Sequence, residues 1–295
     1  MTTDAAGAVR SAPNSEGSPA RFWRRFRRQK LPFIAACFLV LLILVAIFAP
    51  VLAPMDPDKQ DLQNTLLGPG LSDHMLGTDQ FGRDTLSRML YATQVEVQAA
   101  GLAVATALVI GVVPGLIAGF FGGKVDAVIM RITDALMSFP PLILAMAIIG
   151  SLGPGLRNAM LAIGVVFAPT FLRIVRGSVL EVREETYIEA SRSIGTPLHW
   201  IIRRHVLPNA LPPLLVQISL AGAFSLLSEA ALSFLGLGVQ PPDSSWGKML
   251  SQGVPYVQQQ PWLLILPGIA VALAVLAFNM VGDGLRDSIG REVRR

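Results

Sequence analysis

Cysteine and charge are both scarce in this 295-residue chain. The single cysteine, Cys37, excludes an intrachain disulfide, and one thiolate is too few for a cysteine-based metal site. Charged residues make up 15% of the chain, whereas ordinary soluble domains carry about 25%. So little charge is poorly suited to a water-exposed surface, and we expect the lipid bilayer to be the solvent of this protein.

Motifs for bond chemistry are missing too. No stretch matches the phosphate-binding loop G-x-x-x-x-G-K-S/T, because the nearest fragment, G-G-K at 122–124, is followed by valine. The three histidines, His74, His199 and His205, lack the spacing of a metal site, and no serine lies in a G-x-S-x-G turn. We therefore expect no catalytic residue, no metal and no cofactor bound by this chain, which would not be an enzyme.

Long apolar blocks occupy much of the sequence, which is 52% hydrophobic with a mean hydropathy of +0.55. The first block, 31–55, has no charged residue, and about 20 such residues cross the hydrocarbon core. Its length favours an uncleaved signal-anchor over a signal peptide, whose apolar region is about 7–15 residues long. The sequence predicts an all-α integral membrane protein with six transmembrane helices. The other expected spans are 96–121, 133–153, 158–176, 209–235 and 262–282.

Basic residues are distributed unevenly around these blocks. Most of the 24 Lys and Arg residues fall in 1–30, 122–132, 173–204 and the C-terminal tail, and an excess of Lys and Arg marks cytoplasmic segments. Because six spans place both termini on one side, we expect the N- and C-termini to be cytoplasmic. The net charge of +4 does not indicate a nucleic-acid partner, since the basic residues lie where they orient helices. The opposite side holds Lys59, Arg83, Arg88, Arg157 and Lys248.

The second block carries a small residue at every fourth position. Such a stripe forms a smooth groove along one helix face, which lets another helix backbone approach closely. We therefore expect tight helix packing along this face. The residues are Ala99, Ala103, Ala107, Gly111, Gly115 and Gly119.

The fifth block carries a more polar stripe, Gln217, Ala221, Ser225 and Glu229, at the same interval. Polar side chains are costly in lipid, so this face is expected to line a cavity or to meet another helix. Gln217, Ser225 and Glu229 are therefore candidates for lining a translocation path. Interhelical hydrogen bonding explains the stripe equally well, and Glu229 could instead sit close to the outer interface.

The longest loop expected in the cytoplasm, 176–208, has the pattern of two short helices. Less polar positions recur every three or four residues before Gly195, which indicates an amphipathic helix. Gly195 can end that helix, Thr196 can cap the next one, and Pro197 suits its first turn. A helix-turn-helix fixed between two spans is better suited to docking a cytoplasmic partner than to binding DNA, and a purely structural loop is the other interpretation.

The residues of this loop resemble the EAA loop of bacterial ATP-binding-cassette (ABC) importer permeases. That pattern reads E-A-A, three residues, G, nine residues, then I-x-L-P, and its spacing fits this sequence throughout. Ser191 replaces the second alanine and His205 replaces the isoleucine, and both exchanges leave the turn intact. The positions expected to dock the ATPase are Glu189, Ala190, Ser191, Gly195, Leu207 and Pro208.

Four further segments resemble the dipeptide, oligopeptide and nickel branch of this family. They are L-G-T-D-Q-F-G-R-D at 76–84, R-H-V-L-P-N at 204–209, L-S-F-L-G-L-G at 232–238 and F-N-M-V-G-D-G-L-R-D at 278–287. Several matches in the right order make the resemblance specific, and it covers about 31–288.

The composition of the tails and the resemblance together predict an architecture for the whole chain. A disordered, basic cytoplasmic tail, 1–30, would precede the first transmembrane helix at 31–55 and an extracytoplasmic loop at 56–94. A five-helix ABC type I importer permease core would fill 95–288, with a cytoplasmic tail at 289–295. The protein would lie in the bacterial inner membrane.

The resemblance also implies partners and a function. A second homologous permease would complete a heterodimer, two cytoplasmic ABC ATPase subunits would use ATP and Mg, and an extracytoplasmic solute-binding protein would meet the loop at 236–260. The chain would be a permease subunit for di- or oligopeptides or a related small solute, coupling ATPase motion to alternating access. An ion-coupled secondary carrier or a channel is the alternative, which transport by the purified chain alone would favour.

Overall fold

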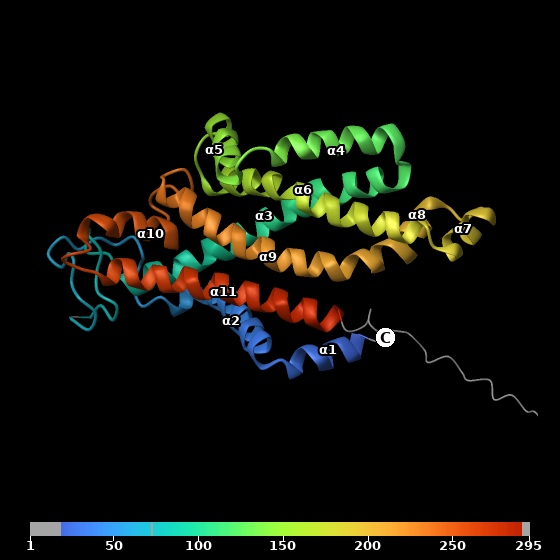
Figure 1. Cartoon of the computed structure of the whole chain (residues 1–295). Helices are drawn as coiled ribbons and strands as arrows, with labels where there is room; N and C mark the ends of the chain where they lie inside the picture. Colours follow the sequence, from blue (N-terminus) through green and yellow to red (C-terminus); the bar gives the residue numbers. More distant parts are fainter. Residues whose placement is uncertain (1–18, 72, 291–295) are drawn as a thin grey trace, which may run out of the picture.

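The computed structural model describes residues 19–71 and 73–290, so residues 1–18 and 291–295 of the two expected tails lie outside the described part. Within it, the regular elements are helices, and the only β pairing is an isolated bridge between Thr78 and Asp84. Figure 1 shows an elongated bundle with α10 and the loop that follows α2 at one end and α7 at the other.

Five helices of the described part are long and apolar enough to cross a membrane. They are α2 (Lys30–Leu52), α3 (Thr85–Phe121), α6 (Leu156–Arg183), the continuous run of α8 (Leu198–Ile201), the π-helix η1 (Ile202–Val206) and α9 (Leu207–Phe234), and α11 (Trp262–Gly290). A sixth apolar segment is a bent pair, α4 (Gly123–Met137) and α5 (Pro141–Leu152), whose axes differ by 94°. The six predicted apolar blocks are therefore present, five as single long helices.

The expected single helix at 133–153 is wrong, and the expected loop at 122–132 is also wrong. The structure places α4 across the loop and ends it at Met137. The chain is then extended at Pro140, with φ −57° and ψ 132°, before α5 begins at Pro141. Proline lacks an N–H group and disfavours helical geometry in the residue before it, so one helix cannot run through two consecutive prolines.

The stripe of small residues on α3 packs against α6, as predicted. All six residues of the stripe are buried. A Cβ atom added to Gly115 would lie 2.7 Å from the carbonyl oxygen of Leu172, and one added to Gly119 would lie 2.5 Å from Cβ of Val179. The two backbones therefore approach as closely as the absence of side chains allows.

The N-terminal helices lie on the outside of the bundle (Figure 1). α1 (Pro19–Arg28) is a helix within the segment expected to be a disordered tail, and its buried Phe26 contacts α11 near Gly284. α2 exposes apolar side chains such as Val40 and Leu41, and Cys37 is exposed on the same helix. An apolar outer face is what a helix in contact with lipid requires.

The end of the bundle that carries α10 is built from loops fastened to helix ends. α3 begins at Thr85, so the loop after α2 is shorter than the expected 56–94, and the carboxylate of Asp84 caps α3 by accepting the N–H of Ser87 at 2.7 Å. The connection after α9 leads to α10 (Trp246–Gly253) and a short 3₁₀ helix, η2 (Val254–Tyr256). Trp246 is buried in the core between α3, α9, α10 and α11.

Candidate functional site

The expected docking segment forms a short helix, a turn and a second helix. After α7 (Thr186–Ser193), the N–H of Thr196 donates to the carbonyl oxygen of Ser191 at 3.0 Å. Gly195 has φ +79°, the left-handed conformation that favours glycine after a helix, as its position predicted. The cap expected at Thr196 is wrong, because its N–H closes the end of α7 and the extended Pro197 is the N-cap residue of α8.

The second helix is not a separate short element. α8 continues through η1 into α9, which makes one helix of 37 residues from Leu198 to Phe234, about 55 Å long at 1.5 Å per residue. Leu207 and Pro208, the last positions of the docking pattern, lie exposed where α9 begins. The docking turn is therefore directly continuous with a membrane span.

Two isoleucines hold the docking turn against the bundle. Ile188 of α7 and Ile201 of α8 have relative exposures of 0% and 1%, and they join Val182 and Val206 in one hydrophobic cluster. Burying a side chain of this size contributes about 1.5–3 kcal/mol. The turn is consequently packed onto the helices that it connects, so it can move with them as one body.

The opposite face of α7 is open. Glu189 and Ala190 are exposed, Ile194 is 82% exposed, and Ser191 is half-buried with its hydroxyl donating to the carbonyl oxygen of Tyr187 at 2.8 Å. The carboxylate of Glu189 makes no hydrogen bond or ion pair to any residue that the structure describes. A free carboxylate beside an exposed isoleucine leaves this face available to a partner.

An aromatic group continues that face onto the second helix. The ring of His205, in η1, lies between Tyr187 and Trp200, with ring centroids 5.2 and 5.3 Å away. Tyr187 and Trp200 are both about half exposed, and Leu198 is exposed next to them. Exposed apolar side chains that form a patch mark a surface that another protein or the membrane covers.

The polar stripe of α9 points mostly into the bundle. Gln217 is half-buried, whereas Ser225 is fully buried and its hydroxyl donates to the carbonyl oxygen of Ala221 at 2.7 Å. Glu229 is fully buried as well and accepts a hydrogen bond from the hydroxyl of Ser233. The C-terminal half of the stripe therefore contacts other parts of this chain, and Glu229 is buried rather than exposed.

A second acidic residue, Glu96 of α3, lies beside Glu229. Its Oε1 accepts the N–H of Trp246, the first residue of α10, at 3.0 Å. Sequence reasoning missed Glu96, although it precedes Ala99 by three residues and so lies on the face of α3 that carries the small stripe. That spacing is the signal that would have found it.

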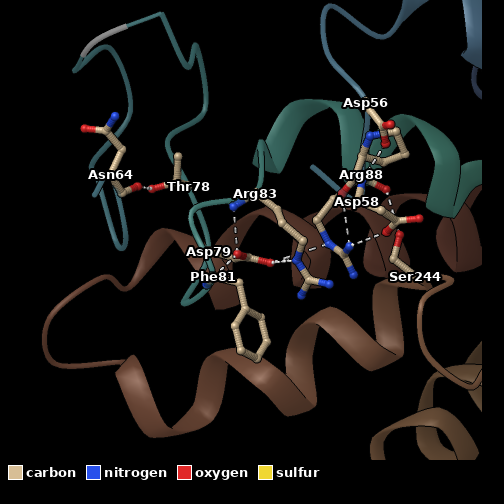
Figure 2. Close-up of polar contacts among 10 residues, drawn as sticks. Asp56, Asp58, Asn64, Thr78, Asp79, Phe81, Arg83, Arg88 and Ser244 are labelled. Carbon is tan, nitrogen blue, oxygen red and sulfur yellow. Dashed lines mark hydrogen bonds and ion pairs between the residues drawn. The ribbon is translucent and has the colours of Figure 1, made fainter. Parts of the chain in front are cut away.

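The segment 76–84 folds around one buried carboxylate (Figure 2). Asp79 accepts hydrogen bonds from the N–H groups of Phe81 and Arg83 at 2.8 and 3.0 Å, and from Nε of Arg83 at 2.7 Å. Gly82 has φ +72° and lies so close to the backbone of Asp61 that a side chain would not fit. The segment is therefore a tightly folded scaffold.

Arg88 fastens this scaffold to α3. Its guanidinium, buried within the protein, donates from Nη1 to the carbonyl oxygen of Pro57 and to the carboxylate of Asp58, both at 3.2 Å. Its Nε lies 3.6 Å from Oδ2 of Asp79, and its backbone carbonyl oxygen accepts the hydroxyl of Ser244 at 3.2 Å. Figure 2 shows how Arg88 links the loop after α2, α3 and the connection before α10.

The acidic side chains of this loop are used in its own hydrogen bonds. The side-chain amide of Asn64 and the N–H of Gln63 donate to the carboxylate of Asp61, at 2.9 and 3.1 Å, and they lower the pKa of Asp61.

Across residues 19–71 and 73–290, no three His, Cys, Asp or Glu side chains are arranged to hold a metal ion.

A helical membrane bundle with an exposed turn continuous with one of its spans has the features of a transporter permease. The family described as "Binding-protein-dependent transport system inner membrane component" matches residues 111–295, and the "N-terminal TM domain of oligopeptide transport permease C" matches residues 19–69. The chain therefore belongs to the family of inner-membrane components of binding-protein-dependent transport systems.

Curated relatives match nearly the whole chain. The dipeptide transport system permease protein DppC of Alkalihalophilus pseudofirmus is 42% identical over 92% of this chain and 89% of its own length. The probable D,D-dipeptide transport system permease protein DdpC of Escherichia coli is 41% identical over 97% and 96%. The glutathione transport system permease protein GsiD of Escherichia coli is 42% identical over 92% and 90%.

Solved structures of the MetNI methionine ABC transporter in inward-facing conformations share the fold. One chain aligns with a TM-score of 0.53 at 22% identity, covering 68% of this chain and 97% of its own. Another aligns with a TM-score of 0.51 at 23% identity, covering 66% and 94%. These structures confirm the all-α importer-permease fold expected from the sequence. The family match and the curated relatives confirm the expected permease function, and the carrier or channel alternative is not favoured.

Proposed function

We propose that this chain is the permease subunit of an ATP-driven importer for di- or oligopeptides or a related small solute. The names of its relatives, which are dipeptide and glutathione transport permeases, support this substrate class. The alignments cover about nine-tenths or more of this chain and of each relative, so the comparison extends over nearly the whole length of those permeases.

The proposed assembly pairs this chain with a second, homologous permease. Two cytoplasmic ABC ATPase subunits hydrolyse ATP with Mg, and an extracytoplasmic solute-binding protein delivers the substrate. The permease itself performs no bond chemistry, which agrees with a sequence that has no phosphate-binding loop. Its task is to convert movement of the ATPases into a change in the accessibility of a cavity.

The proposed orientation places both termini and the docking turn in the cytoplasm of the bacterium. Figure 1 supports a common side for the turn and the C-terminus, because α7 and the last turns of α11 lie toward the same end of the bundle. Basic residues such as Arg203 and Arg204 lie at that end, in keeping with the excess of Lys and Arg on the cytoplasmic side.

The docking turn is the observation that carries the proposal. Its outer face, with Glu189, Ala190 and Ile194, is free, while Ile188 and Ile201 hold its inner face against the bundle. A partner that grips the free face therefore moves the continuous helix behind it. Along that helix, Gln217, Ser225 and Glu229 are the candidates for lining the translocation path, and of the three only Gln217 is partly exposed in this structure.

Two substitutions in the docking turn test the proposal. A side chain at Gly195 meets no atom within 4 Å, so Gly195→Val acts through backbone strain alone, which costs about 1–3 kcal/mol. Glu189→Ala removes the free carboxylate without touching the fold. We expect both variants to insert and to pair with the second permease, while uptake falls roughly tenfold, the effect of ~1.4 kcal/mol on the docked state.

The control is Glu184→Ala, which removes a neighbouring exposed carboxylate outside the docking pattern. Uptake of a labelled dipeptide and co-purification of the ATPase subunits are measured for all three variants. Near-normal uptake by both Gly195→Val and Glu189→Ala would contradict a coupling role for the turn.

A further inference from the structure

Two acidic side chains are buried together near the outer ends of α3 and α9. Glu96 is 2% exposed and Glu229 is 0% exposed. Oε1 of Glu96 accepts the N–H of Trp246 at 3.0 Å, and Oε1 of Glu229 accepts the hydroxyl of Ser233. The Oε2 atoms of both residues have no hydrogen-bond partner among the described residues. The two residues meet at the start of α10, because Glu96 binds the N–H of Trp246 and the next residue, Gly247, packs on Ala230, which follows Glu229.

The surroundings of the pair contain no charge that would compensate it. No Lys, Arg or His side chain in the described part forms an ion pair with Glu96 or Glu229. Glu96 borders a cavity of about 310 Å³ between α2, α3, α9 and α11, whose lining is apolar apart from Thr93, Glu96 and Trp246. Two ionised carboxylates in such surroundings would repel each other, whereas one proton between them permits a carboxyl–carboxylate hydrogen bond.

The pair also holds the elements that follow α9. The hydroxyl of Ser233, which donates to Glu229, accepts the N–H of Val239 at 2.9 Å. Gly247 of α10 lies directly on α9, since a Cβ atom there would be 2.5 Å from Cα of Ala230. α10 is thus fixed to α3 through Glu96 and to α9 through its own backbone.

The docking turn lies at the other end of the same helix. Leu198 to Phe234 form one helix of 37 residues, which begins at the turn and carries Glu229 near its end. Figure 1 shows α7 and α10 at opposite ends of the bundle. A rotation or shift imposed at the turn therefore reaches α10 through an unbroken helix.

We propose that Glu96 and Glu229 are positioning residues: a proton shared between their carboxyl groups joins α9 to α3, which holds α10 through Glu96, so that α10 and the loop before it follow the docking turn. The inference rests on the proposed function, in which the 236–260 segment meets the solute-binding protein. The joint lets the outer surface that receives this protein sense the state of the ATPases, and lets the bound protein act on the ATPases in return.

The test uses the full complex of both permeases and both ATPases in lipid nanodiscs. The rate of ATP hydrolysis is measured with and without the substrate-loaded binding protein, and the ratio of the two rates is called the stimulation. Glu96→Leu removes the acceptor for Trp246 and the partner of Glu229. We expect basal hydrolysis to stay within about twofold of the wild type. We expect the stimulation to fall roughly fivefold, because the loss of one buried hydrogen bond typically changes an equilibrium constant by about that factor.

Glu96→Gln is the conservative variant, because its amide can donate to Glu229 without needing a shared proton. We expect Glu96→Gln to restore most of the stimulation. If Glu96 acted only by filling space, Glu96→Leu and Glu96→Gln should behave alike. Gln98→Leu, an exposed position on the same helix, is the matched control and should behave like the wild type.

Normal stimulation in Glu96→Leu would overturn the inference. If that variant does not assemble, Ser233→Ala decides in its place, because it removes the hydroxyl that bridges Glu229 and the loop, and normal stimulation in it would equally overturn the joint. Loss of stimulation in Glu96→Gln with Gln98→Leu normal would contradict the shared hydrogen bond. Absence of stimulation in the wild-type complex would instead contradict the proposed function.

Discussion

At the scale of single residues, the space around a glycine decides what replacing it would do. Gly115 of α3 faces the backbone of α6, where an added Cβ would lie 2.7 Å from the carbonyl oxygen of Leu172 and 3.0 Å from Cβ of Val175. Gly101, on the same helix, has no atom within 4 Å of that position. Gly115 belongs to the small-residue stripe that packs against α6 and Gly101 does not, so the difference lies in the neighbouring helix.

Gly115→Ala should therefore destabilise the permease, whereas Gly101→Ala should be neutral or slightly stabilising. Overpacking costs about 1–3 kcal/mol, and alanine in a helix gains roughly 0.5–1 kcal/mol over glycine. The thermal midpoint of the purified permease pair is the measurement. Equal midpoints for the two variants would show that α3 and α6 are less tightly packed than described.

Of two local expectations at the docking turn, the one for Gly195 is confirmed and the cap at Thr196 is wrong. The left-handed backbone of Gly195 follows from a glycine placed before Thr196 and Pro197, and the structure has it. The three-residue spacing from Ala99 would have placed Glu96 on the stripe face of α3, but its pairing with Glu229, a residue on another helix, could not be predicted from that spacing. A single-sequence pattern records neighbours along one helix, but it does not record which helices meet.

At the scale of elements, the loop after α2 is held by its polar residues rather than by an apolar core. Asp84 both caps α3 through Ser87 and binds Nδ1 of His74 at 3.0 Å. Hydrogen bonds among buried polar groups therefore stabilise this loop, as apolar packing stabilises the helices. These groups are Asp79, Arg83 and the Asp84 cap.

Asp84→Ala should consequently loosen the loop. Losing a helix cap alone costs about 0.5–2 kcal/mol, and His74 would also lose its partner. Limited proteolysis of the purified complex should show faster cleavage between residues 53 and 84. Asp73→Ala, an exposed carboxylate in the same loop, serves as the control, and equal cleavage rates in the two variants would refute the capping argument.

The boundaries of the spans show where hydropathy stops being informative. Five apolar blocks became single long helices because uniform apolar composition demands internally satisfied backbone hydrogen bonds. The block at 133–153 was equally apolar, yet Pro140 and Pro141 divide it. Hydropathy counts the proline side chain and ignores the N–H that it lacks, so the 94° bend between α4 and α5 was not foreseen.

At the scale of the whole molecule, the proposed orientation makes a labelling prediction. Asp243 and Ser193 are exposed. Ser193 is the last residue of α7 and Asp243 lies in the connection before α10, and Figure 1 shows α7 and α10 at opposite ends of the bundle. In a Cys37→Ala background, Asp243→Cys in intact spheroplasts should react with an impermeant maleimide and Ser193→Cys should not. Both should react once the membrane is permeabilised. Labelling of Ser193→Cys in intact spheroplasts would reverse the assignment of the two sides.

The unbroken helix from Leu198 to Phe234 also restricts how this protein can evolve. Each residue turns an α-helix by about 100°, so one insertion between the docking turn and Glu229 would rotate Glu229 away from Glu96. Side chains along the helix can be exchanged, but its residue count cannot change freely. The π-helix η1, which contains His205, already departs from regular α-helical winding. An inserted residue would disturb the docking turn and Glu229 least if it were accommodated there.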